Sequence, residues 1–107
     1  MISRALLDEQ DIGAGLRTVQ WQRIDSFLVR AIRFKSFTDA VDFVAAIAPV
    51  AESINHHPDI DVRWRTVNLR VQTHSEGGLT EFDFELARRL DALAAERGGV
   101  TAVNVTP

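Results

Sequence analysis

The sequence predicts an α+β domain, in which a four-stranded antiparallel sheet carries three helices on one face, in the order helix, two strands, helix, two strands, helix. Three observations support this prediction. Apolar residues recur at three- and four-residue steps in the longer segments, which is the helical period. Shorter segments alternate between apolar and polar residues or are rich in β-branched residues, as strands are. Glycine, proline and small polar residues separate these segments.

The first half of the chain contains a short helix followed by two strands. Residues 7–16 form the helix. The strands fall within residues 18–34, with Trp21 in the first strand and an apolar, β-branched run at 27–32 in the second. The Asp25-Ser26 pair supplies the turn between them.

A long helix comes next. Ser36 or Thr38 caps its start, and Pro58 ends it, because proline disfavours the helical conformation in the preceding residue. Pro49 lies inside the helix and should kink it. We expect the buried apolar stripe to consist of Phe37, Val41, Val44, Ile47, Ala51 and Ile54.

The second half repeats the pattern with two strands and a helix. Residues 60–64 and 67–71 alternate between apolar and polar side chains. His74 continues the polar parity of the second strand, so it should leave the strand on the face opposite the apolar set. Gly77-Gly78 interrupts the chain and Thr80 caps the last helix. The buried stripe of that helix should be Phe82, Leu86, Leu90 and Leu93.

The domain organisation is simple. A chain of 107 residues can bury about 65% of its extended surface, which is enough for one core. Residues 7–97 therefore form a single domain, with no repeat or linker. Residues 98–107 are small, β-branched or polar, and we expect a loosely ordered tail.

Composition narrows the function classes. The chain is 46% hydrophobic and 25% charged, as is typical of soluble globular proteins. The lack of cysteine excludes disulfides and thiol-based zinc sites. A net charge of −3 without a basic cluster argues against nucleic-acid binding. The first residues lack a long apolar run, so no signal peptide or membrane segment is expected and the cytoplasm is the expected location.

The three histidines of the chain indicate proton-transfer chemistry, because imidazole has an unperturbed pKa of about 6.5 and can both give and take a proton near neutral pH. They occur together with acids, an amide and an aromatic residue. The candidate site residues are Glu52, Asn55, His56, His57, Trp64, His74 and Asp83.

Each of these residues also has a purely structural interpretation. His56 and His57 could simply interact with the dipole at a helix end. Glu52 lies four residues before His56, so both should lie on one side of the helix, but it could be a solvated acid. Asp83 completes a capping box at the start of the last helix. Trp64 could belong to the core or form an aromatic wall for a flat heterocycle.

A metal site is the other chemical alternative, since three histidines and a glutamate could bind zinc. Adjacent histidines seldom converge on one ion, and neither His-x3-His nor His-Glu-x-x-His is present. We therefore expect no metal.

The spacing of these residues resembles the signature of the pterin-4a-carbinolamine dehydratase family. The matched positions are Glu52, His56, His57, Pro58, Trp64, His74 and Asp83. The resemblance extends over roughly residues 7 to 95. Ile60 stands where many relatives carry tryptophan, and Asn55 where some carry aspartate.

The resemblance implies a four-stranded antiparallel sheet with three helices, a homodimer or homotetramer, and no cofactor. It implies the dehydration of 4a-hydroxytetrahydropterin to quinonoid dihydropterin. His56 and His74 would then be the acid/base pair, and His57 would orient the pterin. Contacts to the substrate are expected from Glu52, Asn55, Trp64 and Asp83. The alternative is a catalytically silent pterin-binding protein or a protein-binding adaptor, as some relatives are dimerisation partners of a transcription factor.

Overall fold

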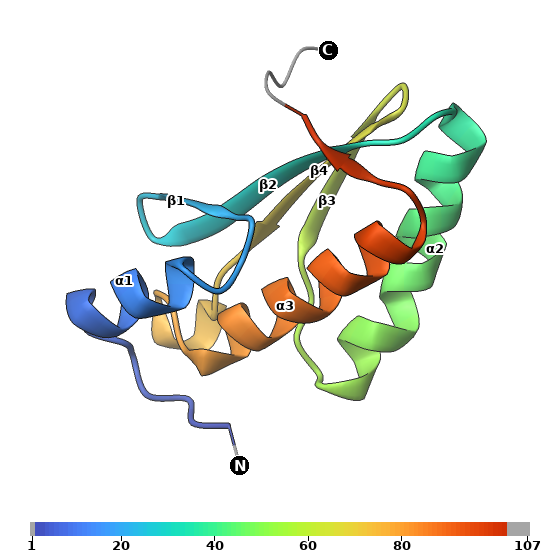
Figure 1. Ribbon diagram of the computed structural model, residues 1–107. Helices are drawn as coiled ribbons and strands as arrows, with labels where there is room; N and C mark the ends of the chain where they lie inside the picture. The colour runs from blue at the N-terminus through green and yellow to red at the C-terminus, as the bar shows by residue number, and fades with distance from the viewer. Residues whose placement is uncertain (1, 103–107) are drawn as a thin grey trace.

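Five antiparallel strands form one sheet, and three α-helices lie on one of its faces (Figure 1). The computed structural model describes residues 2–102. The elements are α1 (Glu9–Leu16), β1 (Gln22–Ile24), β2 (Phe27–Arg33), α2 (Phe37–Ser53), β3 (Asp59–Arg63), β4 (Thr66–Val71), the 3-10 helix η1 (His74–Glu76), α3 (Glu81–Glu96) and β5 (Val100–Thr101). The strand order is β1-β2-β4-β3, with β5 paired to β2. The predicted fold class is confirmed, with one strand more than expected.

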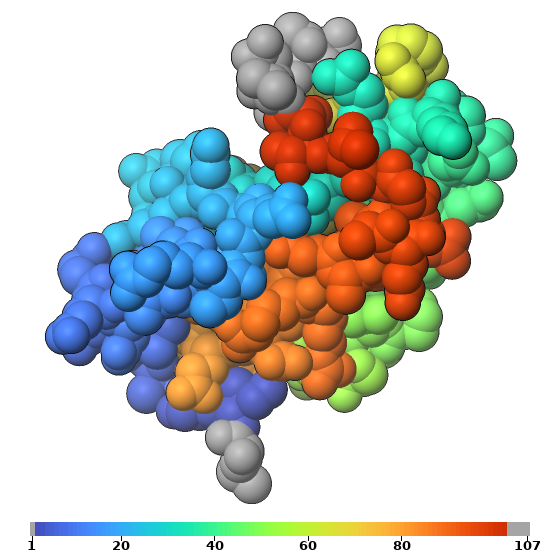
Figure 2. Space-filling model, viewed as in Figure 1, coloured from blue at the N-terminus to red at the C-terminus, as the bar shows by residue number. Residues whose placement is uncertain are grey.

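The alternation read from the sequence determines which face of the sheet is buried. In β4, Val67, Leu69 and Val71 are buried beneath the helices. Asn68 and Arg70, between them, belong to the opposite face, which no helix of residues 2–102 covers. Figure 2 shows the covered side, with α1 and α3 side by side and α2 beyond them. Among residues 2–102, no helix is both long and apolar enough to cross a membrane.

The buried stripe of helix α2 agrees with the prediction at Ile47 and Ala51 but not near the start of the helix. Its N-cap is Ser36, whose hydroxyl accepts a hydrogen bond from the Asp39 amide at 3.0 Å. The predicted Phe37 and Val41 are 55% and 42% exposed. The helix is apolar on more than one side, and periodicity alone cannot tell which side faces the sheet. The helix continues through Pro49 to Ser53. Its buried residues are Ala40, Phe43, Ile47 and Ala51.

Helix α3 crosses the sheet and begins, as predicted, at Thr80. Phe82 and Leu93, expected in its buried stripe, are only half-buried. The buried residues of the helix include a carboxylate and are Asp83, Phe84, Leu86, Ala87, Leu90 and Ala94. The prediction is therefore confirmed at Leu86 and Leu90, whereas Phe82 and Leu93 lie at the margin of the buried face.

The chain after α3 departs from the loose tail that the sequence predicts. Val100 and Thr101 form β5 and pair with Arg33 and Ile32 of β2. The amide of Ala102 then donates a 2.9 Å hydrogen bond to β2. β1 covers only one end of β2, so the remaining edge is free to pair with a segment distant in sequence. Residues 103–107 of the predicted tail lie outside the described residues.

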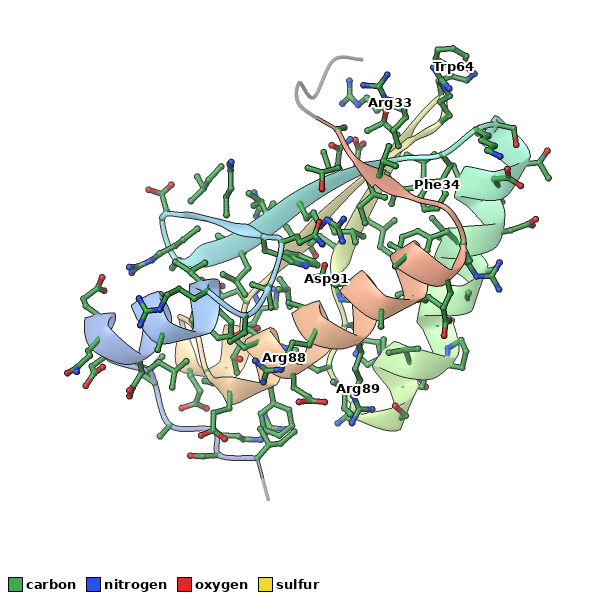
Figure 3. The ribbon with its side chains drawn as sticks, viewed as in Figure 1. Arg33, Phe34, Trp64, Arg88, Arg89 and Asp91 are labelled. Carbon is green, nitrogen blue, oxygen red and sulfur yellow. The ribbon has the colours of Figure 1, made fainter. Side chains whose placement is uncertain are left out.

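A polar cluster between sheet and helices links β5 to the rest of the fold (Figure 3). Arg30 points from β2 to the helix-covered side, and its guanidinium lies 2.6 Å from the Asp91 carboxylate of α3. Asp91 also accepts hydrogen bonds from the Trp21 indole at 2.7 Å and the Gln20 amide at 2.9 Å. The guanidinium is 3.3 Å from the Thr101 hydroxyl. Trp21 is buried just before β1, not within it.

Candidate functional site

The three histidines lie at the same end of the sheet. His56 and His57 lie in the link between α2 and β3, and His74 begins η1 after β4. Because Asp59 pairs with Arg70 in the β3–β4 ladder, the residues just before β3 lie across from those just after β4. The fold therefore brings residues 56–57 and 74 to the same end, as the sequence predicts.

The end of α2 directs His56 inward. After Ser53 the chain turns at Asn55, whose φ of 49° is in the left-handed region that asparagine tolerates better than most residues. The His56 amide then donates a 3.0 Å hydrogen bond to the Ala51 carbonyl. Asn55 is exposed, and its visible role is to form this turn.

His56 is paired with a buried carboxylate. Its Nε2 lies 2.6 Å from Oδ1 of Asp83, and the two residues are 7% and 0% exposed. The other carboxylate oxygen, Oδ2, accepts hydrogen bonds from the Thr73 hydroxyl and the Thr80 amide, both at 2.8 Å. Asp83 completes the capping box of α3 and contacts a histidine as well. Because protein groups occupy both of its oxygens, its contact is with His56 and not with solvent.

Glu52 pairs with His57 and not with His56. Its carboxylate forms a hydrogen bond with Nε2 of His57, and the two side chains are 73% and 52% exposed. The prediction that Glu52 and His56 share a helix face is wrong, because α2 ends at Ser53 and the following residues leave the helical path. The exposed pair forms the solvent side of the site.

His74 lies on the open side of the sheet, as its parity predicts. Its ring meets the edge of Phe27 with 6.3 Å between centroids. The guanidinium of Arg70 covers the same Phe27 ring at 4.0 Å and lies 3.8 Å from the Asp59 carboxylate. Phe27 and Arg70 are not among the residues singled out from the sequence. The shared parity of Arg70 and His74 in the strand pattern is the signal that could have identified Arg70.

Trp64 is not brought to the histidines. It lies in the β3–β4 turn with a φ of 53°, is 71% exposed, and carries the Arg65 guanidinium at 4.7 Å from its ring (Figure 3). Strand β3 lies between Trp64 and His57 in the chain. Because a strand rises about 3.3 Å per residue, the two residues are about 20 Å apart. Within this chain, Trp64 therefore forms no wall beside the imidazoles.

Phe82 and Thr73 complete the surroundings of His56. The Phe82 ring is 5.6 Å from the His56 ring. Arg4, in the N-terminal segment, places its guanidinium 4.9 Å from the Phe82 ring. Thr73 is 2% exposed and contacts Asp83 directly. From the sequence, Phe82 is predicted only as a core residue, and Thr73 is only the neighbour of His74.

The chemical capacity of this end of the molecule is proton transfer. It offers one imidazole with a buried carboxylate behind it, one exposed imidazole with an exposed carboxylate, and His74 beside an aromatic ring. Among residues 2–102, no three or more histidine or acidic side chains are arranged to hold a metal ion. A hollow of about 610 Å³ on the open face of the sheet reaches this end at Asp59 and Arg70.

Comparison with known proteins relates this arrangement to one family. The model of the family described as pterin 4 alpha carbinolamine dehydratase matches residues 5–93, which include every candidate site residue. A protein of Mycobacterium avium (strain 104) that is named for this family is 47% identical over 90 residues, and the match covers 83% of this chain and 96% of that protein.

Two solved structures are similar in fold. A protein of Brucella melitensis described as a transcriptional coactivator/pterin dehydratase is 35% identical with a TM-score of 0.80, over 84% of this chain and 99% of that one. A pterin dehydratase-like protein identified as a RuBisCO assembly factor in the alpha-carboxysome is 27% identical with a TM-score of 0.57, over 71% and 88%. With its family model matched over most of its length, the chain belongs to the pterin-4-alpha-carbinolamine dehydratase family.

Proposed function

We propose that this protein dehydrates 4a-hydroxytetrahydropterin to quinonoid dihydropterin by histidine acid/base catalysis. The buried His56–Asp83 pair is the observation that carries the proposal, since a fully buried carboxylate stabilises the imidazolium that forms when His56 takes up a proton. A catalytically silent member of the family has no need of this pair. Membership of the family supplies the reaction class.

The reaction requires two proton movements, which two imidazoles can supply. The C4a–O bond breaks as the hydroxyl is protonated and leaves as water, and N5 loses its proton as the C4a=N5 double bond forms. His56 and His74 exchange these protons, one as acid and the other as base, so no net proton is consumed. His57, held by Glu52, orients the pterin or its hydroxyl.

A protein-binding function is the second candidate. Phe37 and Val41 expose apolar side chains on α2, far more than core residues do. The two structural relatives are described as a transcriptional coactivator/pterin dehydratase and as a RuBisCO assembly factor. An adaptor function would use an exposed apolar surface of this kind and would not require the histidines.

The decisive experiment is a spectrophotometric assay with synthetic 4a-hydroxytetrahydropterin. The wild-type protein should accelerate loss of the hydroxypterin above its spontaneous rate. The His56→Ala/His74→Ala double variant, checked for folding by circular dichroism, is the matched control. A folded wild-type protein that produces no acceleration would favour the adaptor function.

A further inference from the structure

Two buried threonines stand behind the carboxylate that holds His56. Thr73 and Thr80 are 2% and 0% exposed, and their hydroxyl oxygens are 2.7 Å apart. Thr73 Oγ1 is also 2.8 Å from Oδ2 of Asp83. Thr80 Oγ1 accepts a 3.2 Å hydrogen bond from the Phe82 amide at the first turn of α3. A continuous line of hydrogen bonds therefore runs from the start of α3 to the His56 ring.

The direction of every hydrogen bond in this line is determined. An ionised carboxylate only accepts, so Thr73 must use its single hydroxyl hydrogen to donate to Asp83. The Thr73 oxygen then accepts the hydrogen of Thr80, whose own oxygen accepts from the Phe82 amide. On the other side of the carboxylate, Nε2 of His56 must be the donor to Oδ1.

The ionised state of Asp83 follows from its surroundings. The carboxylate accepts from the Thr80 amide and from the Thr73 hydroxyl, and it lies at the third position of α3, where the helix dipole favours a negative charge. Loss of the Thr73 donor would leave the Thr80 amide as the remaining donor to Oδ2 within residues 2–102, which weakens the stabilisation of the buried charge.

The second ring nitrogen of His56, Nδ1, is not part of this line of hydrogen bonds. Nδ1 has no hydrogen-bond partner within residues 2–102, and it is not one of the fully buried atoms without a partner in that range. In the neutral imidazole with a proton on Nε2, the lone pair is on Nδ1.

We infer that Thr73 and Thr80 are positioning residues that hold His56 in the tautomer protonated on Nε2, so that Nδ1 is the atom that exchanges a proton with the substrate. The inference rests on the proposed dehydratase function for its catalytic part. The tautomer itself is a property of the free protein, so it can be tested without substrate.

The test compares Thr73→Val with Thr73→Ser. Valine keeps the shape of threonine but removes the donor to Asp83, whereas serine keeps the hydroxyl. Nitrogen-15 NMR of the histidine rings should show His56 of the wild type protonated on Nε2 when neutral, a mixture of tautomers in Thr73→Val, and the wild-type tautomer in Thr73→Ser. Thr66→Val, the same change at the far end of β4, should leave the His56 signals unchanged.

Kinetics provide the second measurement. The Thr73 hydroxyl donates to a charged group, and the typical strength of such a hydrogen bond corresponds to about 10- to 100-fold in a rate or equilibrium constant. Thr73→Val should lose this much in kcat with little change in KM, since the tautomer matters to the reaction and not to ground-state binding. Thr73→Ser should recover most of the loss.

The outcomes separate the two hypotheses. A neutral wild-type His56 protonated on Nδ1, or a Thr73→Val variant that keeps both tautomer and kcat, overturns the inference. If Thr73→Val fails to fold, the wild-type tautomer and the Thr80→Val variant decide the question. The expected tautomers in a protein without dehydratase activity would support the positioning role and reject the proposed function.

Discussion

At the scale of single residues, Asp83 has two functions that depend on one location. As the third residue of α3 it caps the helix, and the same position places its second oxygen beside His56. A carboxylate at the start of a helix is stabilised by the unpaired amides there. The start of α3 thus supplies a buried anion beside the histidine.

The histidines should differ in how their removal affects the kinetics. General acid–base help from one group is typically worth about 10²–10⁴-fold in rate, so His56→Ala and His74→Ala should each lose this much in kcat. His57→Ala should show more of its loss in KM, because its paired and exposed ring makes an orienting contact. Steady-state kinetics on folded variants measure these effects.

The double variant His56→Ala/His74→Ala should fall short of the product of the two single losses, because both groups act in one reaction. Thermal unfolding curves provide the folding control. Near-wild-type rates in all three single variants would exclude the histidine mechanism.

At the scale of elements, the polar cluster around Asp91 holds α3, β2 and the segment before β1 together. We call it the Asp91 cluster. Removal of one member of a buried ion pair leaves the other charge unpaired and costs about 3–5 kcal/mol. The side chains of Arg30 and Asp91 are 4% and 15% exposed. Asp91→Ala should therefore lower the free energy of unfolding by about 3 kcal/mol, as measured by urea denaturation.

The matched control for Asp91→Ala is Glu85→Gln on the solvent side of the same helix. Arg89 donates a 2.8 Å hydrogen bond to Glu85 and lowers the pKa of that carboxyl. Because the pKa of Glu85 is lower in the folded state, this carboxylate stabilises the fold at pH values above the ordinary pKa of glutamate. The contribution is lost as the pH falls through the lower pKa of the folded state. The exposed pair is worth no more than about 0.5 kcal/mol at pH 7. Equal losses in the two variants would show that the Asp91 cluster behaves as a surface pair.

At the scale of the whole molecule, several surfaces remain uncovered in the described part of one chain. β3 is an edge strand, one face of the sheet carries no helix, and α2 exposes Phe37 and Val41. Edge strands with unpaired backbone groups and exposed apolar side chains both favour association. These features support the homodimer or homotetramer that the family resemblance implies.

Light scattering tests this prediction directly. At micromolar concentrations the measured mass should be two or four times that of a single chain. Phe37→Ser/Val41→Ser should weaken the assembly if α2 takes part, whereas substitution of the exposed Glu96 on α3 is a neutral control. A mass equal to one chain across this range would contradict the prediction.

The sequence by itself determined the fold class, the order of the elements from α1 to α3, and the family. Strand alternation depends on neighbouring residues, so β4 and the open-face position of His74 were predictable. Capping also acts over three residues, so Thr80 was recognised as a helix cap and Ser36 was one of the two candidates for the start of α2. The histidine spacing identified a family whose model covers residues 5–93.

Only the tertiary structure decided which groups pair. Glu52 pairs with His57 because α2 ends at Ser53, so the i, i+4 spacing of a helix does not apply between Glu52 and His56. Asp83 reached His56 across 27 residues of sequence, and β5 found the free edge of β2. Local patterns report the conformation of adjacent residues, whereas these contacts depend on how distant segments pack around one core. Trp64 shows the same limit. It is close to His57 in sequence but distant in space, because the extended strand β3 lies between them.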